Sequence, residues 1–144
     1  MKEYKKVSKI MNESSHLNDY IKIRNKREKF DNLYKSEKYI FKKFLKKNYT
    51  VLDVGCLFGS LSLSLKKFKV KYSGLDNDIN AIKYGKKIFK NIDIHYDNFL
   101  KPKKKYKKYD FVFALNVFEH FENWKNVILS LRKFSNKYIC FTSN

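Results

Sequence analysis

The segment from Tyr49 to Gly59 constrains the fold of this chain more than any other part. Four residues typical of a buried strand, Val51 to Val54, run into two glycines that stand four positions apart, Gly55 and Gly59. Glycine adopts the left-handed conformations of tight turns at little cost and lets a ligand lie against the main chain. The segment therefore predicts a strand, a tight turn and the start of a helix, where backbone N–H groups favour a carboxylate.

Short apolar runs then alternate with segments of helix length. We expect strands at 51–54, 70–75, 92–96, 111–115 and 138–142, and helices at 59–67, 78–89 and 124–134. The segment 59–67 also alternates like a strand, but a strand that passes through a glycine turn usually enters a helix. The pattern predicts an α/β fold whose open, mainly parallel, doubly wound sheet has about five strands.

Two helices are predicted in more detail. Ile40, Phe41, Phe44 and Leu45 would share one helix face, with Ser36 as the N-cap. Asp78 is the expected N-cap of the helix at 78–89, where Ile79, Ile82 and Phe89 would face inward and Gly85 costs about 1 kcal/mol relative to alanine.

The domain limits follow from these patterns. Residues 1–17 are polar and irregular and predict a flexible basic arm, and residues 18–144 predict a single domain. Within it, helices at 18–47 would precede an α/β core at 49–144. No apolar run approaches the roughly 20 residues of a membrane span, and the amino terminus does not resemble a signal sequence, so a cytoplasmic protein is expected. Cys56 and Cys140 lack zinc-ligand spacing, so no metal site is expected.

The net charge of +19 points less clearly to a partner than its size suggests. Only three of the 33 basic residues are arginine, and the abundance of lysine, asparagine and isoleucine is typical of A/T-rich codons. Arginine is the usual bidentate reader of base edges and phosphates. Its scarcity makes nucleic acid a partner that the sequence allows but does not favour.

Acidic side chains stand at or just after the carboxyl ends of the first three predicted strands. Asp53 lies within the first strand, Asp76 ends the second 21 residues after Gly55, and Asp97 follows the third. Ligands bind at the carboxyl ends of parallel strands, where an acid such as Asp76 accepts the two ribose hydroxyls of a nucleotide-like cofactor. The dinucleotide fingerprint would require glycine at Leu57 and Ser60, so a pyrophosphate site is disfavoured.

Four segments together resemble the class I S-adenosylmethionine (SAM) dependent methyltransferases. The first is the loop at 53–59, which matches the family's acid-x-Gly-x-Gly-x-Gly motif except at its central glycine. The others are the acid at Asp76, the acid at Asp97, and the Tyr109-Asp110 strand that leads to Glu119-His120. The resemblance covers roughly residues 36–144, is closest to the small-molecule type, and lacks the final helix and strand pair of the family fold. The fifth strand would then be an exposed edge, which a homodimer or a partner chain would cover.

The resemblance implies a set of cofactor-binding residues. These are Asp53, Gly55, Cys56, Gly59, Asp76, Asn77, Asp97, Asn98 and Asn116. By the same resemblance, Asp53 would hold the loop and the ammonium of the methionine part, and Asp97 would take the adenine amine. The central glycine of the family is Leu57 here, and its side chain would crowd the cofactor unless the backbone directs it outward.

The implied reaction is in-line transfer of the SAM methyl group, which leaves S-adenosylhomocysteine. Asn116, Glu119 and His120 would lie nearest the methyl, and His120 is either the general base or a packed histidine at a helix start. We expect a small-molecule acceptor of lipid, quinone or sugar type, methylated on oxygen or nitrogen. The alternatives are a degenerate or partner-dependent SAM-binding module without independent catalysis and, less favoured, an RNA methyltransferase.

Overall fold

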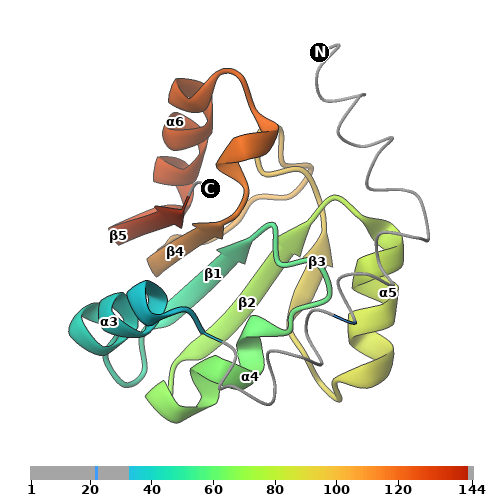
Figure 1. Ribbon diagram of the computed structural model, residues 1–144. Helices are drawn as coiled ribbons and strands as arrows, with labels where there is room; N and C mark the ends of the chain where they lie inside the picture. The colour runs from blue at the N-terminus through green and yellow to red at the C-terminus, as the bar shows by residue number, and fades with distance from the viewer. Residues whose placement is uncertain (1–21, 23–32, 143–144) are drawn as a thin grey trace.

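The fold is a five-stranded, wholly parallel sheet with helices on both faces (Figure 1). The computed structural model describes Lys22 and residues 33–142, so the predicted arm at 1–17 and most of the helical segment before 33 lie outside the described residues. The strand order is β3-β2-β1-β4-β5. The strands are β1 Thr50–Val54, β2 Lys71–Asp76, β3 Ile94–Tyr96, β4 Tyr109–Leu115 and β5 Ser135–Thr142. The predicted parallel, doubly wound sheet is confirmed.

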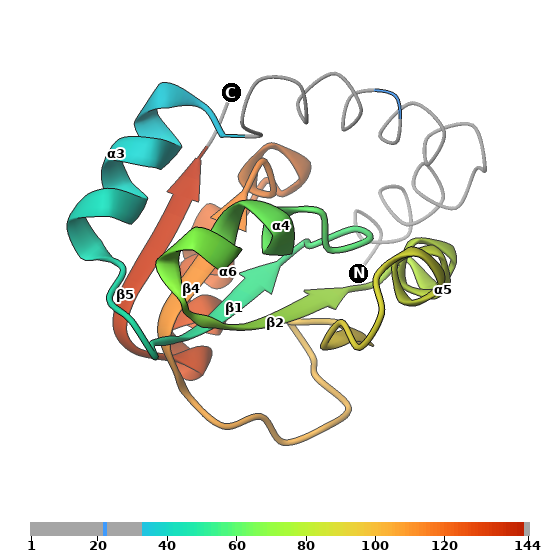
Figure 2. The ribbon, with the colours of Figure 1, turned by 90° about the horizontal axis from the view of Figure 1, so that it is seen from below.

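The helices divide between the two faces of this sheet (Figures 1 and 2). On one face lie α3 Lys35–Phe44, α4 Leu61–Leu65 with its 3-10 extension η1 Lys66–Phe68, and α5 Ile79–Ile88. The other face carries α6 Trp124–Phe134, which follows the 3-10 turn η2 Phe118–His120. The ambiguous segment after Gly59 is therefore a helix, as predicted. No helix among the described residues is long and apolar enough to cross a membrane.

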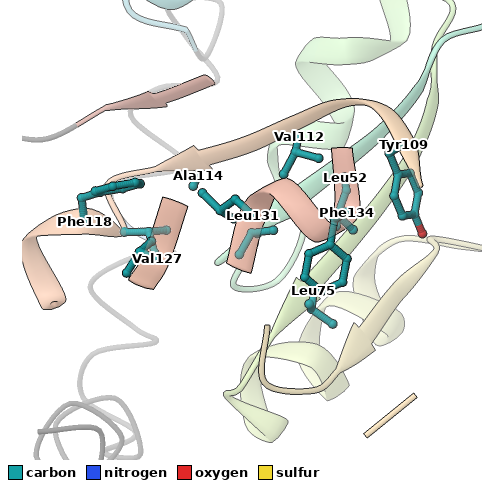
Figure 3. Close-up of a cluster of buried hydrophobic side chains, with 11 residues drawn as sticks. Leu52, Leu75, Tyr109, Val112, Ala114, Phe118, Val127, Leu131 and Phe134 are labelled. Atoms are coloured by element: carbon teal, nitrogen blue, oxygen red, sulfur yellow. The ribbon is translucent and has the colours of Figure 1, made fainter. Parts of the chain in front are cut away.

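Strand β4 holds the two faces together because its side chains alternate between them. Phe111 and Phe113 pack with Phe41 of α3, and Val112 and Ala114 point to α6. Figure 3 shows the cluster on the α6 side, in which side chains of three strands meet one face of the helix. A parallel strand buried on both sides is expected to form a continuous apolar run, as β4 does from Phe111 to Leu115.

The first described helix differs from its prediction at its start. The predicted apolar face is confirmed, since Phe41 and Leu45 are buried, but the N-cap at Ser36 is wrong. The helix begins at Lys35, with Tyr34 in the N-cap position and Ser36 exposed in the first turn. Glu37 explains the difference, because from the N3 position its carboxylate accepts the N–H of the N-cap residue Tyr34 at 2.9 Å and so fixes the helix start at Lys35.

Helix α5 begins as predicted and buries a different stripe. Asp78 caps it by accepting the N–H groups of Asn80 and Ala81. Ile82 is buried, but Ile79 is exposed and Phe89 only half-buried, because the buried stripe runs through Ala81, Ile82 and Gly85. A Cβ at Gly85 would collide with the carbonyl oxygen of Phe58, so this glycine lets the helix approach the loop after β1.

Candidate functional site

The loop after β1 folds back against β2 and the start of β3. The N–H groups of Gly55 and Cys56 both donate to the carbonyl oxygen of Leu75, at 2.8 and 3.2 Å. Gly55 and Gly59 have φ values of 76° and 83°, in the left-handed region that favours glycine. A Cβ at Gly59 would lie 2.5 Å from the Cδ1 atom of Ile92. Both glycines are therefore required by this turn.

Asp76 links three of the strand ends. Its Oδ2 atom accepts the Leu57 N–H at 2.7 Å, and its Oδ1 atom accepts the Asp78 N–H at 2.8 Å. Its carbonyl oxygen accepts the Asp97 N–H at 2.9 Å, which attaches the end of β3. Burial raises the pKa of Asp76 to about 6, against the opposing effect of the backbone hydrogen bonds. The predicted convergence of the loops after β1, β2 and β3 is thus present.

Asp53 is buried in β1 and has a side-chain partner that the sequence did not reveal. The hydroxyl of Tyr72 in β2 donates to its Oδ2 atom at 2.8 Å. Burial raises the pKa of Asp53 to about 7, the Tyr72 hydrogen bond lowers it, and the charge of Asp76 raises it further. Tyr72 pairs in register with Val51, two residues from Asp53 and on the same face of the sheet. That neighbour becomes visible only once the strand register is known.

Asp97 anchors the lysine-rich loop that follows β3. Its carboxylate accepts the backbone N–H groups of Asn98, Lys103 and Lys104 and the hydroxyl of Tyr106 at 2.9 Å. Burial alone would raise the pKa of Asp97, but these hydrogen bonds together hold it below its ordinary value. The lysine side chains of this loop, at 101–108, are exposed, and one carboxylate organises its backbone.

The loop after β4 carries the three predicted catalytic side chains. Asn116 has a φ of 54°, donates its N–H to the Thr142 hydroxyl at 3.1 Å and accepts that hydroxyl at its Oδ1 atom. Glu119 is exposed, and His120 is half-buried as the last residue of η2, four residues before α6 begins. In the described part of the chain, neither side chain is held by a hydrogen bond or an ion pair.

Contact between this loop and the β1 loop passes through Val117. A Cβ at Gly55 would lie 2.5 Å from the Cγ2 atom of Val117, so the Val117 side chain reaches the backbone of the β1 loop only because residue 55 is glycine. Cys56 contributes its backbone alone, because its thiol is buried with Ile82 and Ile94 on the α5 side. The structure therefore brings together the four loops that follow β1, β2, β3 and β4. It shows no direct contact of Glu119 or His120 with Asp53 or Asp76.

The central residue of the β1 loop, Leu57, adopts the left-handed conformation with a φ of 52°. This conformation costs a residue with a side chain about 1–2 kcal/mol. Its N–H nevertheless makes the short bond to Asp76, and its side chain is half-buried. Leucine thus occupies a turn position whose backbone suits glycine.

The assembled edge can accept a ligand that carries hydrogen-bond donors. Asp53 and Asp76 supply carboxylate oxygens, and the turn between them exposes the backbone of Gly55. An ammonium group and vicinal hydroxyls are ligand groups that such acceptors bind. Among the described residues, no group of three or more histidine, cysteine or acidic side chains is arranged to hold a metal ion.

A family model described as a methyltransferase domain matches residues 24–139. The chain belongs to this family. By family and fold it is a class I, SAM-dependent methyltransferase domain, and its cofactor is SAM. No curated protein matches the sequence.

Solved methyltransferase structures share the fold of this domain. A TehB-like SAM-dependent methyltransferase from Corynebacterium glutamicum is 17% identical with a TM-score of 0.69, over 85% of this chain and 68% of that one. A SAM-dependent methyltransferase from Aquifex aeolicus is 23% identical with a TM-score of 0.62, over 82% and 71%. The plantazolicin methyltransferase BpumL, in complex with a triazolic desmethylPZN analog and S-adenosylhomocysteine, is 23% identical with a TM-score of 0.57, over 69% and 39%. The domain spans 41% and 31% of the lengths of two further neighbours.

Proposed function

We propose that this domain transfers the SAM methyl group to an oxygen or nitrogen atom of a small molecule of lipid, quinone or sugar type, in the cytoplasm. The observation that carries the proposal is the hydrogen bond from Leu57 to Asp76. It joins the glycine turn after β1 to the acid at the end of β2, the two parts between which the methionine and ribose groups of SAM would lie.

The cofactor roles follow from the acceptors that the structure leaves at this edge. Asp53 would pair with the ammonium of the methionine part, and Asp76 with the ribose hydroxyls beside Asn77. The carboxylate of Asp97 already receives three N–H groups and a hydroxyl. We therefore assign Asp97 to positioning the loop, and adenine recognition to the backbone that it holds, beginning at Asn98.

The chemistry asks little of the protein beyond orientation. SAM supplies its own leaving group, so the domain has to align the acceptor with the methyl and exclude water. His120 would remove a proton where the acceptor is a hydroxyl, and exposed Glu119 would help to orient the acceptor. Asn116 would contact the cofactor, because Thr142 fixes its side chain at the end of β4.

A small-molecule acceptor has some support from structural neighbours. Coclaurine N-methyltransferase was solved with N-methylheliamine, and BpumL with a triazolic desmethylPZN analog, each together with S-adenosylhomocysteine. These two proteins are 19% and 23% identical to this chain, so their ligands indicate a class of acceptor and not its identity.

A second candidate function is a SAM-binding module that needs a partner for catalysis. The left-handed Leu57 favours it, because a branched side chain at the centre of the loop costs strain and occupies space beside the cofactor. The exposed edge of β5, where a homodimer or partner chain would add, favours it as well. Both candidates require that SAM binds.

Calorimetric titration with SAM and S-adenosylhomocysteine tests this shared requirement. We expect binding of both, with affinity reduced at least tenfold in D76N, which keeps the size of the side chain but loses its charge. D110N loses the same charge at the opposite edge of the sheet, where Asp110 pairs with Lys137, and serves as a matched control. Absence of binding by the unmodified domain would overturn both candidates.

Methyl transfer from labelled SAM to small-molecule extracts then separates the two candidates. Labelled product that disappears in D76N and falls in H120A supports catalysis. SAM binding without labelled product above the D76N background supports the partner-dependent module.

A further inference from the structure

The amino-terminal edge of the sheet, opposite the candidate site, is bordered by helix ends (Figure 1). α3, η1, α5 and α6 each lead into the strand that follows, so all four end at this edge. Each carries two basic residues in its last turn. They are Lys42 and Lys43, Lys66 and Lys67, Lys86 and Lys87, and Arg132 and Lys133.

The segments that enter the strands add further lysines to the same edge. They are Lys46, Lys47, Lys69, Lys71, Lys90, Lys107, Lys108 and Lys137. The described acids at this edge are Asp93 and Asp110, and Asp110 is paired with Lys137 at 3.1 Å. The other described acids lie elsewhere: Glu37, Asp53, Asp76, Asp78, Asp97, Glu119 and Glu122. Acidic side chains are therefore sparse at this edge, whereas lysines occur on both sides of the sheet and are more numerous here.

Codon bias and helix electrostatics explain only part of this arrangement. A/T-rich codons raise the number of lysines without sorting them to one end of the sheet. A cation in the last turn of a helix gains about 0.3–1 kcal/mol from the helix dipole, which accounts for the terminal pairs. The lysines that enter the strands have no such benefit and repel one another, so their position is not a requirement of the fold.

We propose that this amino-terminal edge binds the phosphate backbone of a nucleic acid without sequence preference. Strands about 4.8 Å apart give five strand starts a width of about 20 Å, which corresponds to about six base pairs of a duplex at about 3.4 Å of helix axis each. Lysine contacts phosphate as a point charge. Arg132 is the one arginine at this edge among the described residues, so bidentate reading of bases has little support there.

The shape of the edge is consistent with this ligand. A cavity of about 460 Å³ lies between η1 and the end of α5, and its polar lining includes Lys66, Lys90, Asn91 and the carboxylate of Asp93, which is paired with His95. An anionic membrane fits less well, because membrane-surface binding normally inserts a broad apolar face. Of the described side chains near this edge, Ile88 and Tyr138 are the large apolar ones that are exposed, at 37% and 39%.

The test compares two variants that lose equal charge. The edge variant carries K46Q, K71Q, K90Q and K108Q. The control variant carries K35Q, K83Q, K101Q and K125Q, at described positions away from this edge. Fluorescence anisotropy measures the affinity of each protein for a labelled 20-nucleotide RNA and for a DNA duplex of mixed sequence, at several salt concentrations. Circular dichroism verifies that both variants are folded.

We expect the edge variant to lose at least about tenfold in affinity at about 0.1 M salt, and the control variant less than about threefold. The salt dependence should also weaken, because each lost phosphate contact removes about 0.7–0.9 from its logarithmic slope. Equal losses in the two variants, or no binding by the unmodified protein at low salt, would overturn the proposal. So would tighter binding to phosphatidylserine vesicles than to RNA and DNA. SAM binding is not needed for any of these outcomes.

Discussion

Removing the hydroxyl of Tyr72 tests the electrostatics of the candidate site most directly. In the structure this hydroxyl donates to Asp53 at 2.8 Å, while burial raises the pKa of Asp53 to about 7. Y72F deletes the donor and keeps the ring. The carboxylate loses a stabilising hydrogen bond, so a larger fraction of Asp53 should be protonated and neutral at pH 7.

The size of this effect follows from the hydrogen bond. A hydrogen bond to a charged group contributes about 1.5–3 kcal/mol, and about 1.4 kcal/mol corresponds to one pH unit. Y72F should therefore move the titration of Asp53 upward by about one to two pH units. At pH 7 the ionised fraction would fall from about one half to between about one tenth and one hundredth. Where the ionised form binds the SAM ammonium, the Kd would rise about 5- to 50-fold.

Calorimetry of SAM binding between pH 6 and 9.5 measures this change. The ratio of the Kd of Y72F to that of the unmodified domain is the informative quantity, because titration of the amino group of SAM cancels in it. We expect a ratio that is large at pH 7 and approaches one near pH 9.5. Y39F is a matched control, since Tyr39 is 64% exposed and its hydroxyl contacts only Lys43 among the described residues.

A Kd ratio that does not change with pH would refute the reasoning, whatever its size. A constant ratio above one would show that Tyr72 acts by packing. A constant ratio of one would show that Asp53 does not meet the cofactor as a carboxylate.

Three further predictions concern Asp53, Leu57 and Asp97. Folding raises the pKa of Asp53 from 3.8 to about 7, so its ionisation lowers the stability of the domain as pH rises from about 4 to 7. D53N should remove this loss and raise the free energy of urea unfolding at pH 8 by up to about 4 kcal/mol, while weakening SAM binding. L57G should tighten SAM binding at nearly unchanged stability, because the relief of about 1–2 kcal/mol of backbone strain offsets the cost of about 0.5–1 kcal/mol from the conformational entropy of glycine. Equal calorimetric affinities of L57G, L57A and the unmodified domain for SAM would show that the leucine side chain does not crowd the cofactor. Folding lowers the pKa of Asp97, so the stability that its carboxylate contributes is present above about pH 4 and is lost as pH falls. D97A should therefore lower the free energy of unfolding by about 3 kcal/mol at pH 7 and by less at pH 3, and equal losses at the two pH values would contradict this.

The architecture was predictable because it depends on local patterns and a few general rules. Continuous apolar runs such as Phe111 to Leu115 indicate buried parallel strands, and the helices between them force right-handed crossovers. Asp78 was identified as a cap because its side chain bonds backbone only two and three residues away. These signals need no knowledge of which strands are neighbours.

The interactions within the site were less predictable because they join residues far apart in the chain. Tyr72 meets Asp53 through the register of β1 and β2, and Val117 meets Gly55 through the pairing of β1 and β4. The start of α3 was predicted wrongly for a different, local reason. Ser36 matched the statistical preference for a cap, but Glu37 formed the actual bond to the backbone of Tyr34.

The stacked pair of Phe118 and Phe141 connects the outer strand with the turn that carries His120. The rings lie 4.4 Å apart, and Phe141 of β5 is 46% exposed at the end of the sheet. A strand or subunit that paired with β5 would contact this ring, and through the stacked pair it would contact η2. Packing against the outer strand would therefore reach the turn that holds Glu119 and His120 without touching either residue.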